Sequence, residues 1–129
     1  MNFNKLIPEL SVSNFEKSLS FYKMLGFCVE YTRENFAFLS LQGTQIMIEK
    51  INDTWSVGKL EKPFGRGINF QIDVNNVNEI HSTLLKNNYP ISFPLETRTY
   101  NANNEEFKEK EFLVQDPDGY LLRFSQTIK

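Results

Sequence analysis

The sequence has little of what several common protein classes need. Cys28 is the only cysteine and His81 the only histidine among 129 residues, so one chain can form neither an internal disulfide nor a site with two histidines. No run approaches the roughly 20 apolar residues of a membrane-spanning helix, and the amino terminus has no basic stretch before an apolar segment. We therefore expect a cytoplasmic protein that does not enter a membrane.

Dense positive charge is also missing. The 14 Lys and Arg and 16 Asp and Glu residues give a formal net charge of −2, and no basic cluster is dense enough to bind a polyanion. Nucleic acid is therefore not an expected partner, whereas a cationic ligand is compatible with this charge. Motifs for a serine nucleophile, a phosphate loop, a dinucleotide site and a zinc protease are absent from the sequence.

What the sequence does contain is typical of a folded domain. Hydrophobic residues make up 40% and charged residues 23%, and 12 residues are phenylalanine. A chain of this length can close one hydrophobic core and is too short for two ordinary ones. We predict a single domain over residues 1–129.

An internal repeat divides this domain into two modules. Shifting the chain by 62 positions lays residues 9–31 over residues 71–93 without a gap, so that Val12 meets Val74 and Asn14 meets Asn76. The paired positions share apolar or polar character more than identity. The predicted organisation is module one at 1–51, a linker at 52–66 and module two at 67–129.

Each module is predicted to contain a strand, a helix and three more strands. Alternating apolar residues predict first strands near 5–12 and 68–74. Helices should follow, with Ser13 and Asn76 as capping residues and Gly26 and Asn88 as left-handed end residues. The other strands are expected near 27–32, 36–41, 45–51, 91–97, 107–115 and 120–125, and residues 100–106 are expected to form a surface loop.

Three segments resemble one known superfamily. They are the LSVSN entry to the first helix, FYKMLGF at its end and FLVQDPDGYLLRF near the carboxyl terminus. Together they are similar to the vicinal-oxygen-chelate (glyoxalase/bleomycin resistance/dioxygenase) superfamily over essentially the whole chain. This resemblance implies an α+β fold in which tandem βαβββ modules form a curved mixed sheet with the helices outside.

Within that superfamily, the segments IPEL, ENFA and EFLVQDPDG look most similar to the bleomycin-resistance proteins. This resemblance implies a homodimer that sequesters a cationic glycopeptide antibiotic in clefts shared by two subunits. We therefore expect antibiotic resistance through ligand binding rather than catalysis, with no catalytic residues.

Many members of the superfamily are enzymes that hold a divalent metal in the concave sheet. The resemblance places the four ligand positions at Ile7, Met47, Gly67 and Arg123, and none of these residues suits such a cation. Arg123 would also bring a permanent positive charge to the metal position. We predict no metal and no cofactor.

Two alternatives stay open. A strand register shifted by two residues would present Glu9, Glu49 and Gln71 as oxygen ligands, and the protein would then be a metal-dependent lyase, isomerase or dioxygenase. In the second alternative the concave face is filled, and the role is oligomeric or regulatory. His81 is expected at the boundary of the second helix and Cys28 in the core or sheet, so neither is a catalytic candidate.

The strand faces opposite the helices are expected to bind a small cationic or aromatic molecule. Carboxylates would attract a cation, and aromatic rings would stack on a planar group. Phe36 and Phe38 fit a place in the hydrophobic core equally well. The candidate ligand-binding residues are Glu9, Tyr31, Phe36, Phe38, Glu49, Trp55, Asn69, Gln71, Phe107, Glu111, Leu113 and Arg123.

Overall fold

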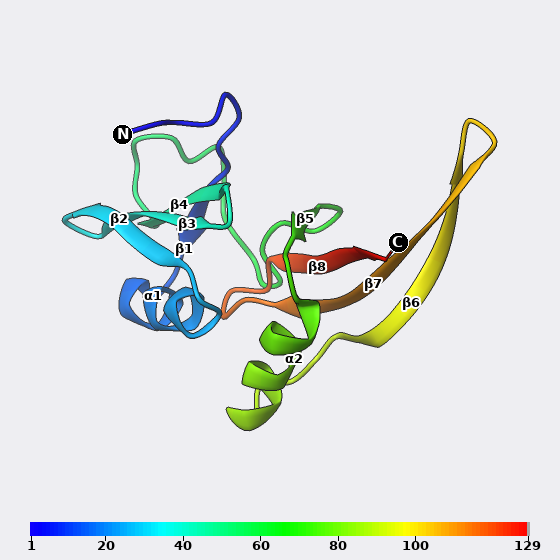
Figure 1. The fold of residues 1–129 in the computed structure, drawn as a ribbon. Coiled ribbons are helices and arrows are strands. Elements are labelled where there is room, and N and C mark those ends of the chain that lie inside the picture. Colours follow the sequence, from blue (N-terminus) through cyan, green and yellow to red (C-terminus); the bar gives the residue numbers. More distant parts are fainter. Residues whose placement is uncertain (129) are drawn as a thin grey trace. The chain divides into compact units, whose positions relative to one another are not determined.

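The computed structural model describes residues 1–128, which form two compact units (Figure 1). The first unit consists of Met1–Phe64 with Pro117–Gly119, and the second of Gly65–Asp116 with the residues from Tyr120 on. Each unit contributes a strand, a helix and three further strands in chain order. The α+β class and the tandem βαβββ arrangement are therefore confirmed, whereas the single domain stays a prediction.

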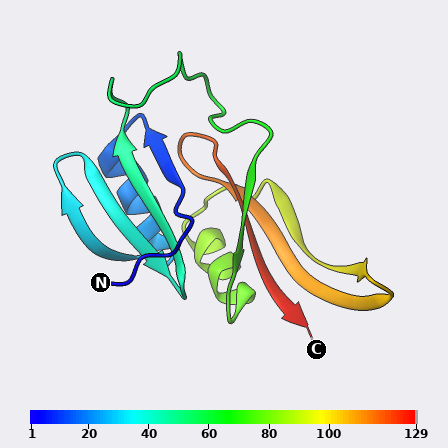
Figure 2. The same ribbon diagram turned by 90° about the horizontal axis from the view of Figure 1, so that it is seen from above.

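The first unit is a four-stranded sheet with one helix against it. The strands lie in the order β1-β4-β3-β2, with β1 parallel to β4 and the other pairs antiparallel (Figure 2). Leu10, Val12 and Ile48 of this sheet and Phe21 and Tyr22 of the helix are buried. The elements are β1 Glu9–Val12, α1 Phe15–Met24, β2 Cys28–Arg33, β3 Phe36–Leu41 and β4 Thr44–Lys50.

The second unit repeats this arrangement. Its strands lie in the order β5-β8-β7-β6, with β5 parallel to β8. His81 of the helix packs edge-on against Phe112, with ring centroids 5.1 Å apart, and Phe112 stacks on Phe124. His81 thus lies at the boundary of the core, as predicted. The elements are β5 Asn69–Asp73, α2 Val77–Lys86, β6 Phe93–Ala102, β7 Glu105–Gln115 and β8 Leu121–Ile128.

The surface loop predicted at residues 100–106 is wrong, because β6 and β7 form one long hairpin there. Asn103 and Asn104 connect the two strands, and both have positive φ (50° and 67°), as a tight two-residue hairpin turn requires. Tyr100 pairs with Phe107 across the hairpin. Cross-strand pairing therefore outweighs the low strand propensity of the Asn and Glu residues in this segment.

The first helix is capped one residue later than predicted. The Asn14 side chain accepts a hydrogen bond from the backbone N–H of Lys17 at 3.0 Å. Ser13 instead donates its N–H and hydroxyl to the buried carboxylate of Asp118. A carboxylate 105 positions away thus competes successfully for the serine that the local pattern assigned to the helix.

The other helix boundaries agree with the prediction. Asn76 caps α2, and Gly26 and Asn88 have positive φ of 105° and 54° at the helix ends. Of the two positions predicted for Cys28, the sheet is correct and the core is wrong, because this residue begins the edge strand β2 and its thiol is exposed. Within residues 1–128, neither helix has the length and hydropathy needed to cross a bilayer.

Candidate functional site

Two pockets lie on the sheet of the second unit, on the face turned away from α2. One has a volume of 220 Å³ and is lined by Gln71, Tyr100, Phe107, Glu109, Glu111, Arg123 and Ser125. The other has a volume of 250 Å³ and is lined by Asn69, Phe93, Arg98, Glu111, Leu113, Leu121 and Arg123. We call the first the hairpin pocket, and Glu111 and Arg123 belong to both.

Strand pairing brings these side chains together from distant parts of the chain. Gln71 of β5 lies beside Arg123 of β8, and Arg123 lies beside Leu113 of β7. Glu111 alternates along β7 with Phe112, whose ring faces the helix, so Glu111 faces the other side. All six candidates predicted in module two line one or both pockets: Asn69, Gln71, Phe107, Glu111, Leu113 and Arg123.

An ion pair with a buried carboxylate lies where the two pockets meet. Glu111 is only 2% exposed, and its Oε2 lies 3.2 Å from Nη1 of Arg123. The Tyr100 hydroxyl donates a hydrogen bond to Oε1 of Glu111. This hydrogen bond, followed by burial, raises the pKa of Tyr100. Arg123 and Tyr100 therefore fix the position of the buried Glu111 carboxylate.

Glu109 adds a second carboxylate to the hairpin pocket. Its Oε1 accepts a hydrogen bond from the Thr127 hydroxyl at 2.9 Å, whereas its buried Oε2 has no hydrogen-bond partner within residues 1–128. Two carboxylates and one guanidinium line this pocket. The hairpin pocket thus has a formal charge of −1 and an acceptor that a bound molecule can satisfy.

Aromatic rings form the wall of the hairpin pocket. Tyr100 and Phe107 stack with centroids 5.8 Å apart and an interplanar angle of 25°. Phe107 is 40% exposed, so its ring is available for stacking. Carboxylates beside an exposed aromatic ring can bind a planar cation.

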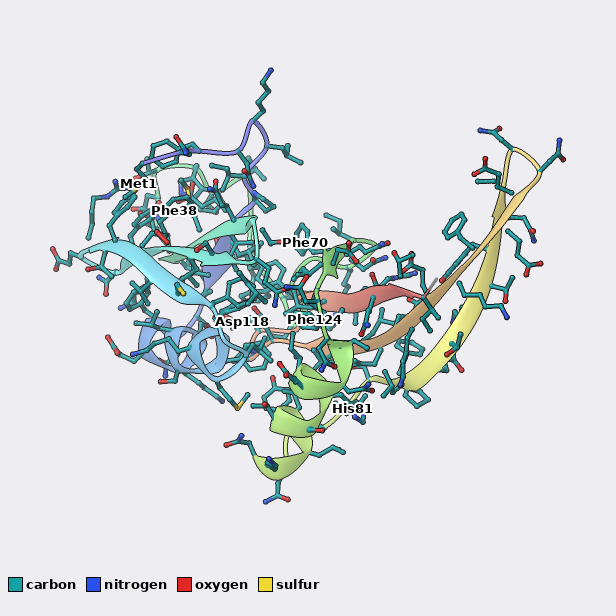
Figure 3. The ribbon with its side chains drawn as sticks, in the orientation of Figure 1. Met1, Phe38, Phe70, His81, Asp118 and Phe124 are labelled. Atoms are coloured by element: carbon teal, nitrogen blue, oxygen red, sulfur yellow. The ribbon has the colours of Figure 1, made fainter. Side chains whose placement is uncertain are left out.

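Two aromatic candidates of the first unit, Phe36 and Phe38, are buried instead. Phe36 is 1% and Phe38 0% exposed. Phe3 covers Phe38 with ring centroids 5.3 Å apart, and the Arg33 guanidinium lies 4.0 Å from the Phe36 ring centre. Tyr31 contacts both phenylalanine rings. In Figure 3 Met1 and Phe38 lie on the same side of this sheet, and a ligand-binding role for these rings stays a prediction.

The amino-terminal segment is fixed over this aromatic cluster by side-chain amides. The backbone N–H of Asn4 donates to the Gln45 side chain at 2.7 Å, and the Gln45 amide donates to the Asn2 carbonyl at 2.8 Å. The Asn4 amide also donates to the carbonyl of Gly43. These contacts hold Phe3 on the face of the sheet that the sequence predicts to be open to a ligand.

The remaining candidates of the first unit form a polar cluster. Oε1 of Glu49 accepts hydrogen bonds from the Trp55 indole at 2.9 Å and from the Asn52 amide at 2.7 Å. Burial, and then the negative charge of Glu49, raises the pKa of Glu9. Trp55 is partly exposed.

The metal site known in the superfamily does not fit these residues. Within residues 1–128, no three or more His, Cys, Asp or Glu side chains are grouped so that they could hold a metal ion. The strand register places Glu9 beside Met47 and Gln71 beside Arg123. Because a thioether and an ion-paired guanidinium are unsuitable ligands for a hard cation, neither pair can form such a site. Glu9 and Glu49 belong to the first unit and Gln71 to the second, so neither unit contains the full alternative ligand set.

The sequence did not identify all residues that line the pockets. Glu109 and Ser125 lie two positions from Glu111 and Arg123, so strand alternation could have found them. Tyr100 was missed because its segment was assigned to a loop. The others missed were Phe93 and Arg98 of β6 and Leu121 of β8.

Comparisons with known proteins agree with the fold. The family model described as the Glyoxalase/Bleomycin resistance protein/Dioxygenase superfamily matches residues 6–124. Bleomycin resistance proteins of Geobacillus stearothermophilus and Staphylococcus aureus are 27% identical over 133 residues, which is 95% of this chain and 96% of theirs.

Solved structures show the same architecture. A virulence protein from Salmonella typhimurium has a TM-score of 0.69 at 21% identity, with 99% of this chain and 100% of that chain covered. A glyoxalase/bleomycin resistance protein/dioxygenase from Alicyclobacillus acidocaldarius has a TM-score of 0.67 at 18% identity, with coverage of 98% and 92%. The family match over most of its length shows that this chain belongs to the glyoxalase/bleomycin resistance protein/dioxygenase superfamily.

Proposed function

We propose that the protein is a metal-independent binding protein that sequesters a small cationic or aromatic molecule. The observation that carries this proposal is the hairpin pocket, where Glu109 and Glu111 lie beside the stacked rings of Tyr100 and Phe107. Similarity to bleomycin resistance proteins makes an antibiotic of the bleomycin family the first candidate ligand.

The arrangement around Glu111 supports binding rather than proton transfer. Its two oxygens face Arg123 and the Tyr100 hydroxyl. A general acid or base must reach a substrate atom and change its protonation state during the reaction. A carboxylate whose two oxygens face a guanidinium and a phenol is instead fixed in orientation, which suits a binding surface.

We also propose that the protein is a homodimer in the cytoplasm and that a second copy completes the ligand cleft. The edge strand β6 offers unpaired backbone groups, and Ile68, Phe93 and Phe107 are exposed in the same unit. Exposed strand edges and apolar side chains favour association, and association of identical chains is most often two-fold symmetric.

Calorimetric titration with metal-free and copper-loaded bleomycin tests the drug-specific form of this proposal. We expect saturable binding with one ligand per chain, and weaker binding by a Glu109→Gln variant. A Glu106→Gln variant is the matched control, since Glu106 lies on the same strand and alternates with Phe107. Absence of heat at high micromolar drug concentrations would exclude bleomycin as the ligand.

Metal analysis of protein purified without chelator tests the metal-independent part. We expect no stoichiometric divalent metal. A bound metal that disappears in a Glu9→Ala variant would instead support the metal-dependent enzyme predicted as the alternative.

A further inference from the structure

In the hairpin pocket, the buried carboxylate of Glu111 has two partners, Arg123 and Tyr100. Tyr100 comes from the β6–β7 hairpin. Tyr100 lies on β6 opposite Phe107, whereas Glu111 lies four residues further along β7. Four residues of a strand span about 13 Å. The Tyr100 and Glu111 side chains must therefore extend toward each other past the position of Glu109, whose Oε2 is buried without a hydrogen-bond partner in the described part of the chain.

Tyr100 thus covers the acidic part of its own pocket. Its phenol is a neutral donor to Glu111, and its ring stacks on Phe107. The segment that carries it, Thr99–Lys108, pairs only within the hairpin except at Lys108, which pairs with Ile128. A two-stranded ribbon is held less firmly than the body of a sheet, so Tyr100 can move away without disturbing the core.

The net charge of the hairpin pocket determines which chemical group can replace the Tyr100 hydroxyl. Glu109 and Glu111 together exceed Arg123 by one negative charge. A ligand with a single positive charge would balance it, and charged donors form stronger hydrogen bonds to carboxylates than a neutral hydroxyl does. A group with several N–H donors could also satisfy Oε2 of Glu109.

We infer that Tyr100 is a displaceable lid and that Glu109 and Glu111 bind an aromatic amidinium or ammonium group, whose N–H donors replace the Tyr100 hydroxyl. The ring of the ligand stacks on Phe107 in place of, or beside, the tyrosine. A volume of 220 Å³ is smaller than a drug-sized site and suits a fragment of one or two rings. This inference rests on the proposed binding function and assigns a chemical class to its ligand.

Calorimetric titration with three probes of the same shape tests the inference. The probes are 2-naphthamidine, the neutral 2-naphthamide and the anionic 2-naphthoate. We expect the amidine to bind at least about tenfold more tightly than the amide, which corresponds to one charge-assisted hydrogen bond. Equal affinity for the amidine and the amide would overturn the inference, as would the absence of amidine binding.

Variants separate the role of Tyr100 as a lid from that of Glu109 and Glu111 as the carboxylates that bind the ligand. Glu109→Gln and Glu111→Gln should weaken amidine binding about tenfold or more, and Glu106→Gln should leave it unchanged. Tyr100→Phe should strengthen it several-fold, because the hydroxyl that competes for Glu111 is gone while the ring remains. Weaker binding by Tyr100→Phe would contradict the role of Tyr100 as a lid. If Glu111→Gln fails to fold because Arg123 loses its partner, Glu109→Gln alone tests whether a carboxylate binds the amidine.

The combined results distinguish the two proposals. If bleomycin or the neutral amide binds but the amidine has no advantage, the protein sequesters a ligand but the assigned class is wrong. If no probe and no bleomycin binds to the folded wild-type chain, both proposals fail.

Discussion

Two phenylalanines on this fold have opposite surroundings. Phe38 is completely buried between the sheet of the first unit and Phe3, whereas Phe107 is 40% exposed beside Tyr100. Removing a buried aromatic ring costs both its transfer free energy and the cavity that it leaves. Removing a half-exposed ring costs much less, but it deletes a stacking surface.

We predict that Phe38→Ala lowers the free energy of unfolding by about 3–5 kcal/mol, whereas Phe107→Ala lowers it by about 1 kcal/mol or less. Urea denaturation measures both changes. Phe107→Ala should also weaken naphthamidine binding up to about tenfold. A Phe38→Ala variant with wild-type stability would contradict the core position of this ring.

Tyr89 gives the fold a measurable response to alkaline pH. Burial, and then the negative charge of Asp116, raises the pKa of Tyr89 from 10.0 to about 12. Its hydroxyl donates to the carbonyl of Gln115 at 2.6 Å. The folded state therefore keeps this proton at pH values where the unfolded chain releases it.

The stabilising contribution of Tyr89 is complete below pH 10 and is lost as the pH rises toward about 12. We predict that the wild-type protein loses unfolding free energy over this interval and that Tyr89→Phe loses less. Denaturant titrations at several pH values measure the two slopes. Identical slopes above pH 10 would show that Tyr89 ionises as freely in the folded protein as in the unfolded chain.

Among the elements, the β6–β7 hairpin determines the most about the site, because it places Tyr100 and Phe107 over Glu111. Its geometry depends on a turn in which Asn103 and Asn104 both have positive φ. Asparagine and glycine tolerate this conformation, whereas alanine is strained by about 1–2 kcal/mol.

We predict that Asn104→Ala lowers stability by about 1 kcal/mol and speeds hydrogen exchange in the hairpin, whereas Asn104→Gly does neither. Thermal unfolding and amide exchange of β6 and β7 provide the measurements. The prediction is wrong if alanine and glycine at this position behave alike.

The elements also show where local sequence patterns were sufficient to predict the structure. Both helices were found because apolar spacing and capping residues lie within a few positions of one another. The strands of the hairpin were predicted near 91–97 and 107–115, but their outer part was assigned to a loop, since it is rich in Asn and Glu. Ser13 was assigned as a helix cap because Asp118, its actual partner, is remote in sequence.

For the molecule as a whole, the assembly state decides whether the pockets are complete within one chain. Light scattering of the purified protein should give a mass of about 30 kDa, twice the 15.1 kDa of one chain. Dilution should lower this mass only when the protein concentration approaches the dissociation constant of the dimer. A mass of 15.1 kDa at every concentration would contradict the proposed homodimer.

The sequence by itself determined the repeat, the order of the elements and both helices, because these depend on residues close together in the chain. It also located Glu111, Arg123 and Phe107 on a shared face. Only the tertiary structure decided that Tyr100 reaches Glu111 and that Phe3 covers Phe38.

The same division applies to Gly119. It has a positive φ of 102°, which glycine adopts without strain, but a side chain there would also lie 2.5 Å from Cβ of Pro63. No local pattern contains that neighbour. Strand register and long-range packing choose the partners of each side chain, and those partners determine which predicted residues are open to a ligand and which are buried.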